Sequence, residues 1–454
     1  MQLVENYPID EIKPAKYNPR SISPEAFEKL KMSLSYGICK PLIINKQNVI
    51  IAGHQRAKAA KAIGLKTVPV FISEKKIPLS HEIQFNLVHN RLENELGLVK
   101  ILNADEIPGG CFYRIEPDRI SVSQFDSPAY IVEAKKLLLQ YGEYGSIIIS
   151  SDGTVVHNVD YAVACKHLAI SPLVYKLEDQ NRVNLLLQQY GIYDFTNIPN
   201  HEYAQTLVQP NRTDSAAWSY LYETYVIPKI DKSLKILDFG AGKGYYYRKL
   251  KNEGYNISAY EPFPRRKKEN AIDVKQVITY IEDVYSKLLM QGLFDVVVLD
   301  SVLNSVTNDV LQEYVLASCN SLLSPNGVLF LGTRHLKSSE STHQSRIANS
   351  KARRLVAFHD QNGYSLQIRN GLFALQKHYG YEELKEFLSK FFKTVCIIKD
   401  DSQYRGFCQF PKKLSVDFIR KATEAEFNMP YPHGYRHNRH RQLVDLICRL
   451  NESK

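Results

Sequence analysis

Cysteine, tryptophan and long apolar runs are scarce in this sequence of 454 residues. No stretch of about 18 consecutive apolar residues occurs, which excludes a membrane-spanning helix. The seven cysteines are scattered and form no Cys-x-x-Cys pair or histidine–cysteine cluster, so neither a disulfide framework nor a metal site is supported. The first residues also lack the charged and then apolar pattern of a signal peptide. We therefore expect a cytoplasmic protein without a membrane partner.

The remaining composition is that of a globular protein whose length exceeds one ordinary domain. Hydrophobic residues make up 44% and charged residues 23%, without an excess of glycine or proline. The net charge of +10 favours an anionic partner such as nucleic acid, and DNA is one candidate. We expect an α/β protein of several domains, whose oligomeric state stays open, a dimer being one expectation.

The first part of the chain alternates short apolar strands with helices. Ser23 and Pro24 are typical of a helix start and predict a helix over 24–36. Apolar strands follow at 41–45 and 49–53, and the alanine-rich stretch 54–65 predicts a second helix.

Four motifs in this part form a recognisable set. They are Asn-Pro-Arg at 18–20, Pro-Leu-Ile-Ile at 41–44, Gly-His-Gln-Arg at 53–56 and Val-Pro-Val at 68–70. The set resembles the ParB/sulfiredoxin-like domain, and Asn-Arg at 90–91 is similar to a helical stretch of that family. The resemblance implies an α+β domain, which we place at residues 1–98.

The Gly-His-Gln-Arg motif is suited to an anionic ligand. A glycine after a strand permits close backbone approach, and the following helix directs its N–H groups at an anion that an arginine fork can also bind. In the family this stretch binds nucleotide phosphates, so the resemblance implies CTP or ATP as a ligand. The alternative is that Arg56 only forms a surface ion pair. The candidate ligand residues are Arg20, Gly53, His54, Gln55 and Arg56.

An internal repeat follows at an offset of about 105 residues. The apolar pattern of residues 8–71 returns over 113–176, but Asn158, Val159, Asp160 and Tyr161 stand where the first copy has Gly-His-Gln-Arg. An aspartate at this place would repel a phosphate. We predict a degenerate second copy over 110–178 that serves as scaffold, interface or substrate platform, chance similarity being the alternative.

Residues 179–232 are expected to form a helical connector. A helix is predicted over 215–228, ending at a proline. Trp218 and the tyrosines at 220, 222 and 225 recur at helical spacing within it. Packing against the next domain is the favoured interpretation of these aromatic residues, and stacking on a base is the alternative.

The strand 234–239 leads into a glycine-rich turn with the spacing Asp-x-Gly-x-Gly-x-Gly over 238–244, and Glu261 ends the next strand. The glycines allow a ligand to approach the backbone, and the acid is placed to accept both ribose hydroxyls. This arrangement resembles class I methyltransferases, which implies S-adenosylmethionine (SAM) as cofactor. A strand predicted over 274–281 would end at Asp283, near the adenine amine. The candidate cofactor residues are Asp238, Gly240, Gly242, Gly244, Glu261 and Asp283.

Further strands are predicted at 294–300, 328–333, 392–398 and 404–410. Alternating strands and helices closed by an antiparallel pair indicate a Rossmann-like, seven-stranded class I methyltransferase domain over 233–412. The fold class is thus α/β multidomain: a ParB/sulfiredoxin-like unit, its degenerate repeat, and this methyltransferase domain.

The methyl acceptor is less defined. The fourth strand is followed by Asp300 and Asn304, our catalytic candidates, but not by the Pro-Pro-aromatic motif of DNA amino-methylases. The Pro-Cys nucleophile of cytosine-C5 enzymes is also missing, so a standard DNA base methylase is disfavoured. A buried strand-end carboxylate and a turn asparagine are the structural alternatives for these two residues.

Basic clusters at 265–268, 351–354 and 431–441 are suited to a polyanion, although a solvated C-terminal face is an equal alternative for the last cluster. Residues 413–454 are predicted to form a basic C-terminal tail or helix. The favoured function is a SAM-dependent methyltransferase with a nucleotide- or DNA-associated module, acting in DNA modification or in phage and mobile-element biology. The alternatives are a small-molecule or protein methyltransferase, and a non-catalytic DNA-binding regulator.

Overall fold

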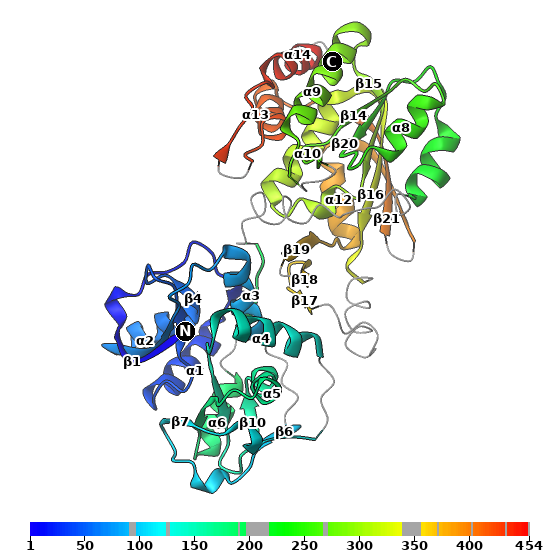
Figure 1. The fold of residues 1–454 in the computed structure, drawn as a ribbon. Helices are drawn as coiled ribbons and strands as arrows, with labels where there is room; N and C mark the ends of the chain where they lie inside the picture. Colours follow the sequence, from blue (N-terminus) through cyan, green and yellow to red (C-terminus); the bar gives the residue numbers. More distant parts are fainter. Residues whose placement is uncertain are drawn as a thin grey trace. The chain divides into compact units, whose positions relative to one another are not determined.

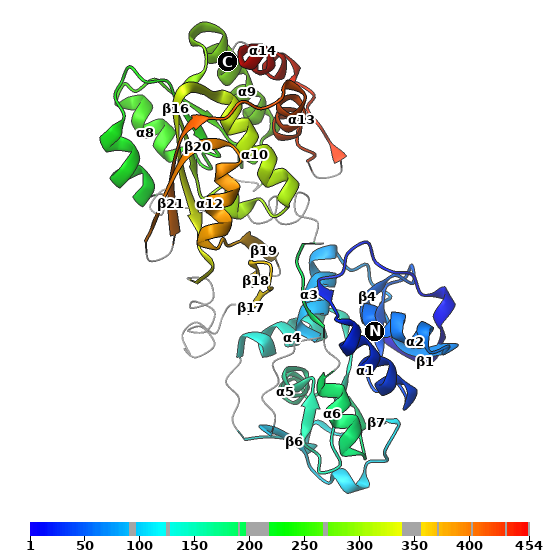
Figure 2. The ribbon, with the colours of Figure 1, turned by 180° about the vertical axis from the view of Figure 1, so that it is seen from behind.

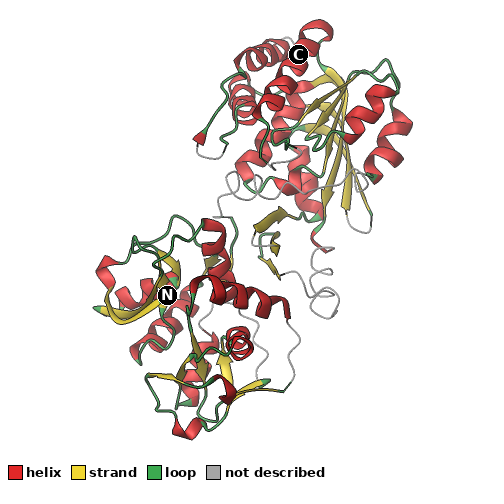
Figure 3. Cartoon of the chain, viewed as in Figure 1, coloured by secondary structure: helices red, strands yellow, loops and turns green. Residues whose placement is uncertain are grey.

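The computed structural model describes residues 1–89, 97–123, 128–188, 191–196, 218–266, 271–337, 356–369, 372–400, 403–431 and 434–452. The chain divides into two compact units, each of which combines helices and strands (Figure 3). The first contains Met1–Ile198, Gln344–Asn362 and Gln367–Leu372, and the second contains Pro199–His343, Gly363–Leu366 and Phe373–Lys454. None of the helices in the described ranges combines the length and apolar character that a membrane span needs.

The first unit begins with a four-stranded sheet in the order β1-β5-β3-β4. The middle pair β5 and β3 is parallel, and the two outer pairs are antiparallel. The strands are β1 (Gln2–Pro8), β3 (Leu42–Ile44), β4 (Ile50–Ala52) and β5 (Thr67–Ile72), and the helices are α1 (Pro24–Ser35), α2 (His54–Ala62) and α3 (Leu79–His89). The predicted cap is confirmed, because the Ser23 hydroxyl accepts from the Ala26 N–H at 3.2 Å.

The second copy has the same topology. Its sheet β7-β11-β9-β10 again has a parallel middle pair and antiparallel outer pairs. Its elements are β7 (Phe112–Arg114), α4 (Pro128–Tyr141), β9 (Ser146–Ile149), β10 (Val155–His157), α5 (Val159–Leu168) and β11 (Leu173–Lys176). The strands β6 (Val99–Ile101) and β8 (Ile120–Val122) form a separate two-stranded sheet, and in sequence β6 precedes β7 and β8 follows it.

The backbones of the two copies turn at corresponding places, as the predicted repeat would require. Left-handed residues recur in pairs 105 positions apart, so that both copies turn at the same places. The pairs are Gly37 and Gly142, Asn48 and Gly153, Gly53 and Asn158, and Gly64 and Ala169. Chance similarity of two α/β units would not reproduce four such positions.

The first part of the predicted connector belongs to the first unit. Helix α6 (Gln180–Gln188) buries Val183 and Leu186 against apolar side chains of the second copy's sheet. The strand β12 (Ile192–Tyr193) then pairs antiparallel with β2 (Arg20–Ser21) of the first copy. The connector prediction is therefore wrong for this part, because burial of apolar side chains ties the segment to the repeats. Residues 197–217 lie outside the described ranges.

The second unit contains a six-stranded sheet in the order β14-β13-β15-β16-β21-β20, of which only β21 is antiparallel to its neighbours. Its strands are β13 (Ile236–Phe239), β14 (Ile257–Tyr260), β15 (Phe294–Asp300), β16 (Leu323–Arg334), β20 (Phe392–Lys399) and β21 (Gln403–Pro411). Helix α8 (Tyr245–Asn252) lies on one face, and α9 (Val274–Gln291) and α10 (Asp309–Leu322) lie on the other (Figure 1). The predicted doubly covered, Rossmann-like sheet is thus confirmed.

Alternation along the strands explains the two faces. Leu237, Val297 and Leu299 belong to the core beneath α9 and α10, while Ile236 and Val296 belong to the core beneath α8. Strands buried on both faces are continuously apolar, as these are.

One strand prediction is wrong. Residues 274–281 form the first turns of α9, which Asp273 caps by accepting from the Gln276 N–H at 3.3 Å. Val277, Ile281, Val284 and Leu288 are buried at helical spacing, and this pattern outweighs the local β-propensity. The described sheet accordingly has six strands rather than seven. Asp283 lies within α9 rather than at a strand end, so its proposed adenine contact has no structural basis.

The C-terminal region is part of the second unit's core. Helices α13 (Val416–Phe427) and α14 (Arg441–Glu452) bury Ile419, Phe427 and Ile447 in the core that contains α9 and α10 (Figure 2). Of the predicted tail or helix, the helical alternative is therefore confirmed, and an unpacked tail is wrong because the apolar stripe of each helix is buried. Within 431–441, Tyr431, His437 and His440 are buried, whereas residues 432–433 lie outside the described ranges.

Further elements lie before β13 and between β16 and β20 in sequence. A three-stranded sheet of β17 (Val356–His359), β18 (Tyr364–Arg369) and β19 (Leu372–Lys377) precedes α12 (Tyr381–Ser389) in sequence. The predicted helix 215–228 is described from residue 218 and is irregular, with a π-helical stretch at Leu221–Val226 and a 3-10 turn at Ile227–Lys229. The basic cluster 351–354 and residues 267–268 lie outside the described ranges.

Candidate functional sites

The glycine-rich turn of the second unit wraps around the end of β14. The N–H groups of Gly240 and Ala241 donate to the Tyr260 carbonyl at 2.7 and 3.0 Å. Gly240, Gly242 and Gly244 all have positive φ, and a Cβ on Gly240 would lie 2.3 Å from the Val302 side chain. A Cβ on Gly242 would meet no atom within 4 Å, so open space lies above the middle of the turn.

Glu261 closes this turn from the next strand. It is 4% exposed, and its carboxylate accepts from the Gly242 N–H at 2.6 Å and from the Phe263 N–H at 2.9 Å. The predicted association of the acid with the glycine loop is therefore present. Two charge-assisted hydrogen bonds hold the carboxylate in one orientation.

Asp238 is the second acid at this edge of the sheet, and it is 5% exposed. Its pKa is raised to about 7, chiefly by burial; the Tyr222 hydroxyl opposes this shift, and the negative charges of Asp300 and Glu261 contribute to it. Three acids from adjacent strands thus converge. A cationic ligand would favour the ionised form of Asp238.

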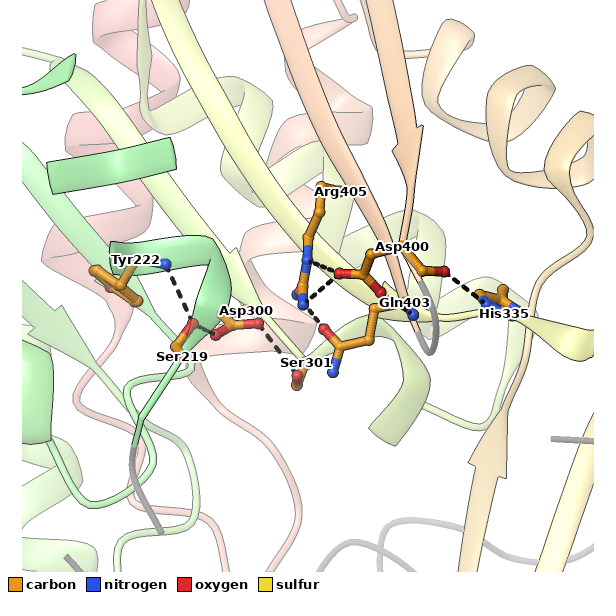
Figure 4. A network of polar contacts seen from close by, with 8 residues as sticks. All are labelled: Ser219, Tyr222, Asp300, Ser301, His335, Asp400, Gln403 and Arg405. Carbon is orange, nitrogen blue, oxygen red and sulfur yellow. Dashed lines mark hydrogen bonds and ion pairs between the residues drawn. The ribbon is translucent and has the colours of Figure 1, made fainter. Parts of the chain in front are cut away.

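Asp300, the third acid, is held by hydroxyl groups (Figure 4). The Ser219 hydroxyl donates to Oδ2 at 2.5 Å, and the Ser301 hydroxyl donates to Oδ1 at 3.2 Å. A Cβ on Gly332 would lie 2.4 Å from Oδ1, so a glycine is needed there. These contacts leave the carboxylate at the carboxyl end of β15 with little freedom to rotate.

A second polar group, which the sequence did not single out, lies near Asp300 (Figure 4). The Arg405 guanidinium donates to Asp400 Oδ2 from Nε at 2.9 Å, and it also contacts Gln403. His335 Nε2 lies 3.2 Å from the Asp400 carbonyl oxygen. No sequence motif marked these residues, because β16 and β21 become neighbours only in the folded sheet.

Asn304 lies in a short 3-10 turn after β15 and is 3% exposed. Its side-chain oxygen has no hydrogen-bond partner within the described part of the chain. A buried amide oxygen without a partner is costly, so a donor from a ligand or water suits this position. Asn304 stays a candidate on the acceptor side.

The first unit's candidate site lies at the start of α2. Gly53 precedes the helix with φ of 101°, and a Cβ there would lie 2.5 Å from Leu42 and 2.9 Å from the Arg56 guanidinium. Arg56 is 8% exposed and donates to the carbonyls of Pro41, at 3.0 Å, and Lys40. The surface ion-pair alternative for Arg56 is therefore wrong.

His54 and Gln55 complete the motif. The His54 ring lies 3.4 Å from the Asn86 side-chain amide, and burial lowers its pKa to about 4, with Lys58 and Arg56 contributing. The imidazole is thus neutral near pH 7. The Gln55 amide donates to the Arg20 carbonyl at 3.4 Å. Arg20, the fifth predicted ligand residue, therefore lies next to the motif.

Two buried basic residues, Lys40 and His157, extend this site beyond the sequence prediction. The Lys40 ammonium donates to the His89 carbonyl at 2.8 Å and also contacts His157 Nε2. Burial lowers the pKa of Lys40, and the strongest charges acting on it are those of Arg56 and Arg20, which lower it further. No sequence motif indicated this grouping, because His157 comes from the second copy.

Arg20 is held in place by residues of β12. Its guanidinium lies 4.4 Å from the centre of the Tyr193 ring, and β2 pairs with β12 at this point. Arg20, Lys40 and Arg56 are each at most 8% exposed. Buried positive charges of this kind are stabilised by an anion.

The corresponding place in the second copy is filled by protein. Asn158 precedes α5 with φ of 63°, and its amide donates to the Ser146 carbonyl at 2.6 Å. Asp160 and Tyr161 line a cavity that His89 of the first copy also lines, and it has room for about one water molecule. A nucleotide does not fit in this space. Within the described residues, no group of three or more histidine, cysteine or acidic side chains is arranged to hold a metal ion.

Two known families match this chain. Residues 1–90 match the ParB N-terminal domain, and residues 212–385 match a methyltransferase domain. Among solved structures, a SAM-dependent methyltransferase from Methanosarcina mazei is 15% identical, with a TM-score of 0.29, over 42% of this chain and 98% of that chain.

Two curated proteins are similar to the N-terminal part. Stage 0 sporulation protein J of Bacillus subtilis (strain 168) is 40% identical over 87 residues, which cover 18% of this chain and 31% of that protein. The ParB-like nuclease domain-containing protein YnaK of Escherichia coli (strain K12) is 35% identical over 66 residues, which cover 14% of this chain and 76% of that protein. The chain thus spans about a third of the length of the sporulation protein.

Proposed function

This chain belongs to the ParB N-terminal domain family through residues 1–90 and carries a methyltransferase domain at 212–385, and we propose that it transfers a methyl group from SAM to an acceptor on or near DNA. In this proposal the N-terminal unit binds a nucleotide, CTP or ATP, and associates with DNA. The methyltransferase domain performs the chemistry.

The observation that carries the methyl-transfer proposal is the contact between Glu261 and the glycine turn. The carboxylate accepts from the Gly242 N–H, so the acid and the turn form one surface, and the space above Gly242 is open. This arrangement fits a nucleoside: Glu261 would accept from the ribose hydroxyls, and the backbone would pass beneath the ligand. Asp238 would hold the positively charged amino group of the methionine moiety. When bound, SAM supplies an activated methyl group.

The nucleotide proposal is supported by the buried cations of the first unit. The start of α2 directs its N–H groups at an anion, and Arg20, Lys40 and Arg56 add positive charge at low exposure. A polyphosphate matches several cations grouped together better than a single carboxylate does.

A DNA-associated acceptor is supported by the ParB-like domain and by the net charge of +10. The sporulation protein matches only the N-terminal part of this chain, so an association of this chain with DNA is part of the proposal. A protein or small-molecule acceptor, and a regulator without turnover, are the competing functions.

The test uses the full chain with radiolabelled SAM. Double-stranded DNA, single-stranded DNA, RNA and cell protein are offered separately, with and without CTP or ATP, and label transfer is counted. We expect label on DNA or on nucleotides released from it. Label on protein alone, or SAM binding without any transfer, would contradict the DNA-methylation proposal.

A further inference from the structure

Two exposed aromatic side chains flank the residue that holds Asp300. Trp218 is 66% exposed and Tyr220 is 39% exposed, and their ring centres are 5.9 Å apart. Ser219 lies between them in sequence, and its hydroxyl donates to Asp300 Oδ2 (Figure 4). Both rings are therefore tied through one residue to the acid at the end of β15.

Packing against the domain was predicted for all four aromatic residues of this segment, and Tyr222 and Tyr225 show it. Tyr222 is 2% exposed and stacks on Tyr246 with ring centres 4.0 Å apart and an interplanar angle of 3°. Tyr225 packs on Phe407 with ring centres 5.1 Å apart. Since these two residues anchor the segment, Trp218 and Tyr220 are not needed to hold it in place.

Tyr220 is nevertheless fixed in orientation. The Arg405 guanidinium lies 5.5 Å from the centre of its ring, and Tyr225 contacts it edge to face at 5.8 Å. Arg405 is itself 5% exposed and paired with Asp400. A ring that is held on these sides and still exposed to solvent has a surface on which a base can stack.

We propose that Trp218 and Tyr220 bind the flat ring of the methyl acceptor, and that Asp300 accepts a hydrogen bond from the exocyclic amine that is methylated. The acceptor class is then an unpaired nucleobase bearing an exocyclic amine. This inference rests on the proposed methyl transfer. The Pro-Pro-aromatic motif is missing after β15, and in this proposal the segment before β13 supplies the stacking surface instead.

Methyl transfer to the exocyclic amine conserves both atoms and charge. The amine nitrogen forms a bond to the methyl carbon while the carbon–sulfur bond breaks, and the electron pair of that bond neutralises the sulfonium. The proton released from the nitrogen passes to Asp300 and then to water. Ser219 acts as a positioning residue, since its hydroxyl sets the direction of the Asp300 carboxylate.

The chain contains one tryptophan, so Trp218 is its own fluorescent reporter. Single-stranded oligonucleotides of adenine, cytosine or thymine, and an abasic strand of equal length, are titrated in the presence of S-adenosylhomocysteine. We expect adenine or cytosine strands to quench the emission and the abasic strand to leave it unchanged. Thymine lacks an exocyclic amine and should bind more weakly. Equal quenching by the abasic strand would overturn the proposal.

Variants separate stacking from general charge attraction. Tyr220→Leu should weaken binding of the preferred strand by about 10- to 100-fold. Tyr113→Leu, an exposed tyrosine of the second copy, is the matched control and should leave binding unchanged. Asp300→Asn should retain stacking and lose transfer. Unchanged affinity in Tyr220→Leu would overturn the acceptor proposal while SAM binding persists, whereas a wild type that binds no SAM overturns both proposals.

Discussion

Three helices of this protein begin in the same way and differ in what surrounds them. Helices α2, α5 and α8 each follow a strand, and each is preceded by a residue with positive φ: Gly53 at 101°, Asn158 at 63° and Gly244 at 69°. In all three, the first N–H groups of the helix have no carbonyl partner within the helix, so the backbone alone would favour an anion at each place.

The surroundings decide the ligand. Buried Arg20, Lys40 and Arg56 reinforce the preference for an anion at α2, while Asp238 and Glu261 reverse it next to α8. At α5 the space is filled by His89 and neighbouring side chains. In our proposals the same turn serves a polyphosphate site at α2 and a site for a positively charged nucleoside at α8, whereas at α5 it makes a packing contact. Neighbouring charge rather than backbone shape distinguishes the two proposed sites.

The largest expected effect is at the acidic site. Glu261→Gln removes a buried charge that accepts from two N–H groups, and we expect SAM affinity to fall about 100-fold by calorimetry. Asp283→Asn makes the same chemical change on α9 and should leave affinity unaltered. Equal losses in both variants would show that Glu261 has no specific role.

The cationic site should respond to the loss of one guanidinium. Arg56→Met preserves apolar bulk and should weaken nucleotide binding about 30-fold, as expected for the loss of charge-assisted hydrogen bonds of about 2 kcal/mol. Lys58→Met removes an exposed cation from the same helix and serves as the control. An affinity for CTP and ATP that is unchanged by Arg56→Met would remove this residue from the site.

The acidic site should also depend on pH. The pKa of Asp238 is about 7 in the unliganded protein because burial disfavours its charge, and a bound cation favours the ionised form. SAM affinity should therefore increase about tenfold from about pH 6 to about pH 8, as binding below the pKa must release a proton. Asp238→Asn should bind more weakly and without this slope. A slope that persists in the variant would assign the titration to another group.

The smallest effect is expected at α5. Asn158→Gly keeps the left-handed backbone and removes one buried hydrogen bond, so unfolding free energy should fall by about 1 kcal/mol in urea denaturation. Nucleotide affinity should not change.

Local patterns in the sequence were sufficient for much of the fold. The Ser23 cap and the glycine turn at 240–244 are short-range features, and each predicted its element correctly. Glu261 was also found at the expected place, because the ends of adjacent parallel strands meet at one edge of a sheet.

The remaining features depend on long-range packing. Residues 274–281 have high β-propensity, but their buried stripe faces the sheet as a helix. His157 approaches Lys40, and Arg405 approaches Tyr220, only after distant segments have come together. Tyr222 packs on Tyr246 and Tyr225 packs on Phe407. Trp218 and Tyr220 remain exposed, and helical spacing does not reveal this difference.

The pairing of β12 with β2 has a consequence for how the first unit forms. Arg20 and Tyr193 are 173 positions apart, so β12 leaves the ribosome long after the Gly-His-Gln-Arg motif. Contacts of such long range form late, since the intervening chain must be ordered first. The proposed nucleotide site would therefore be completed only when both copies and α6 have been synthesised. A fragment that ends at residue 98 keeps every residue of the motif and lacks the strand that holds Arg20 in place.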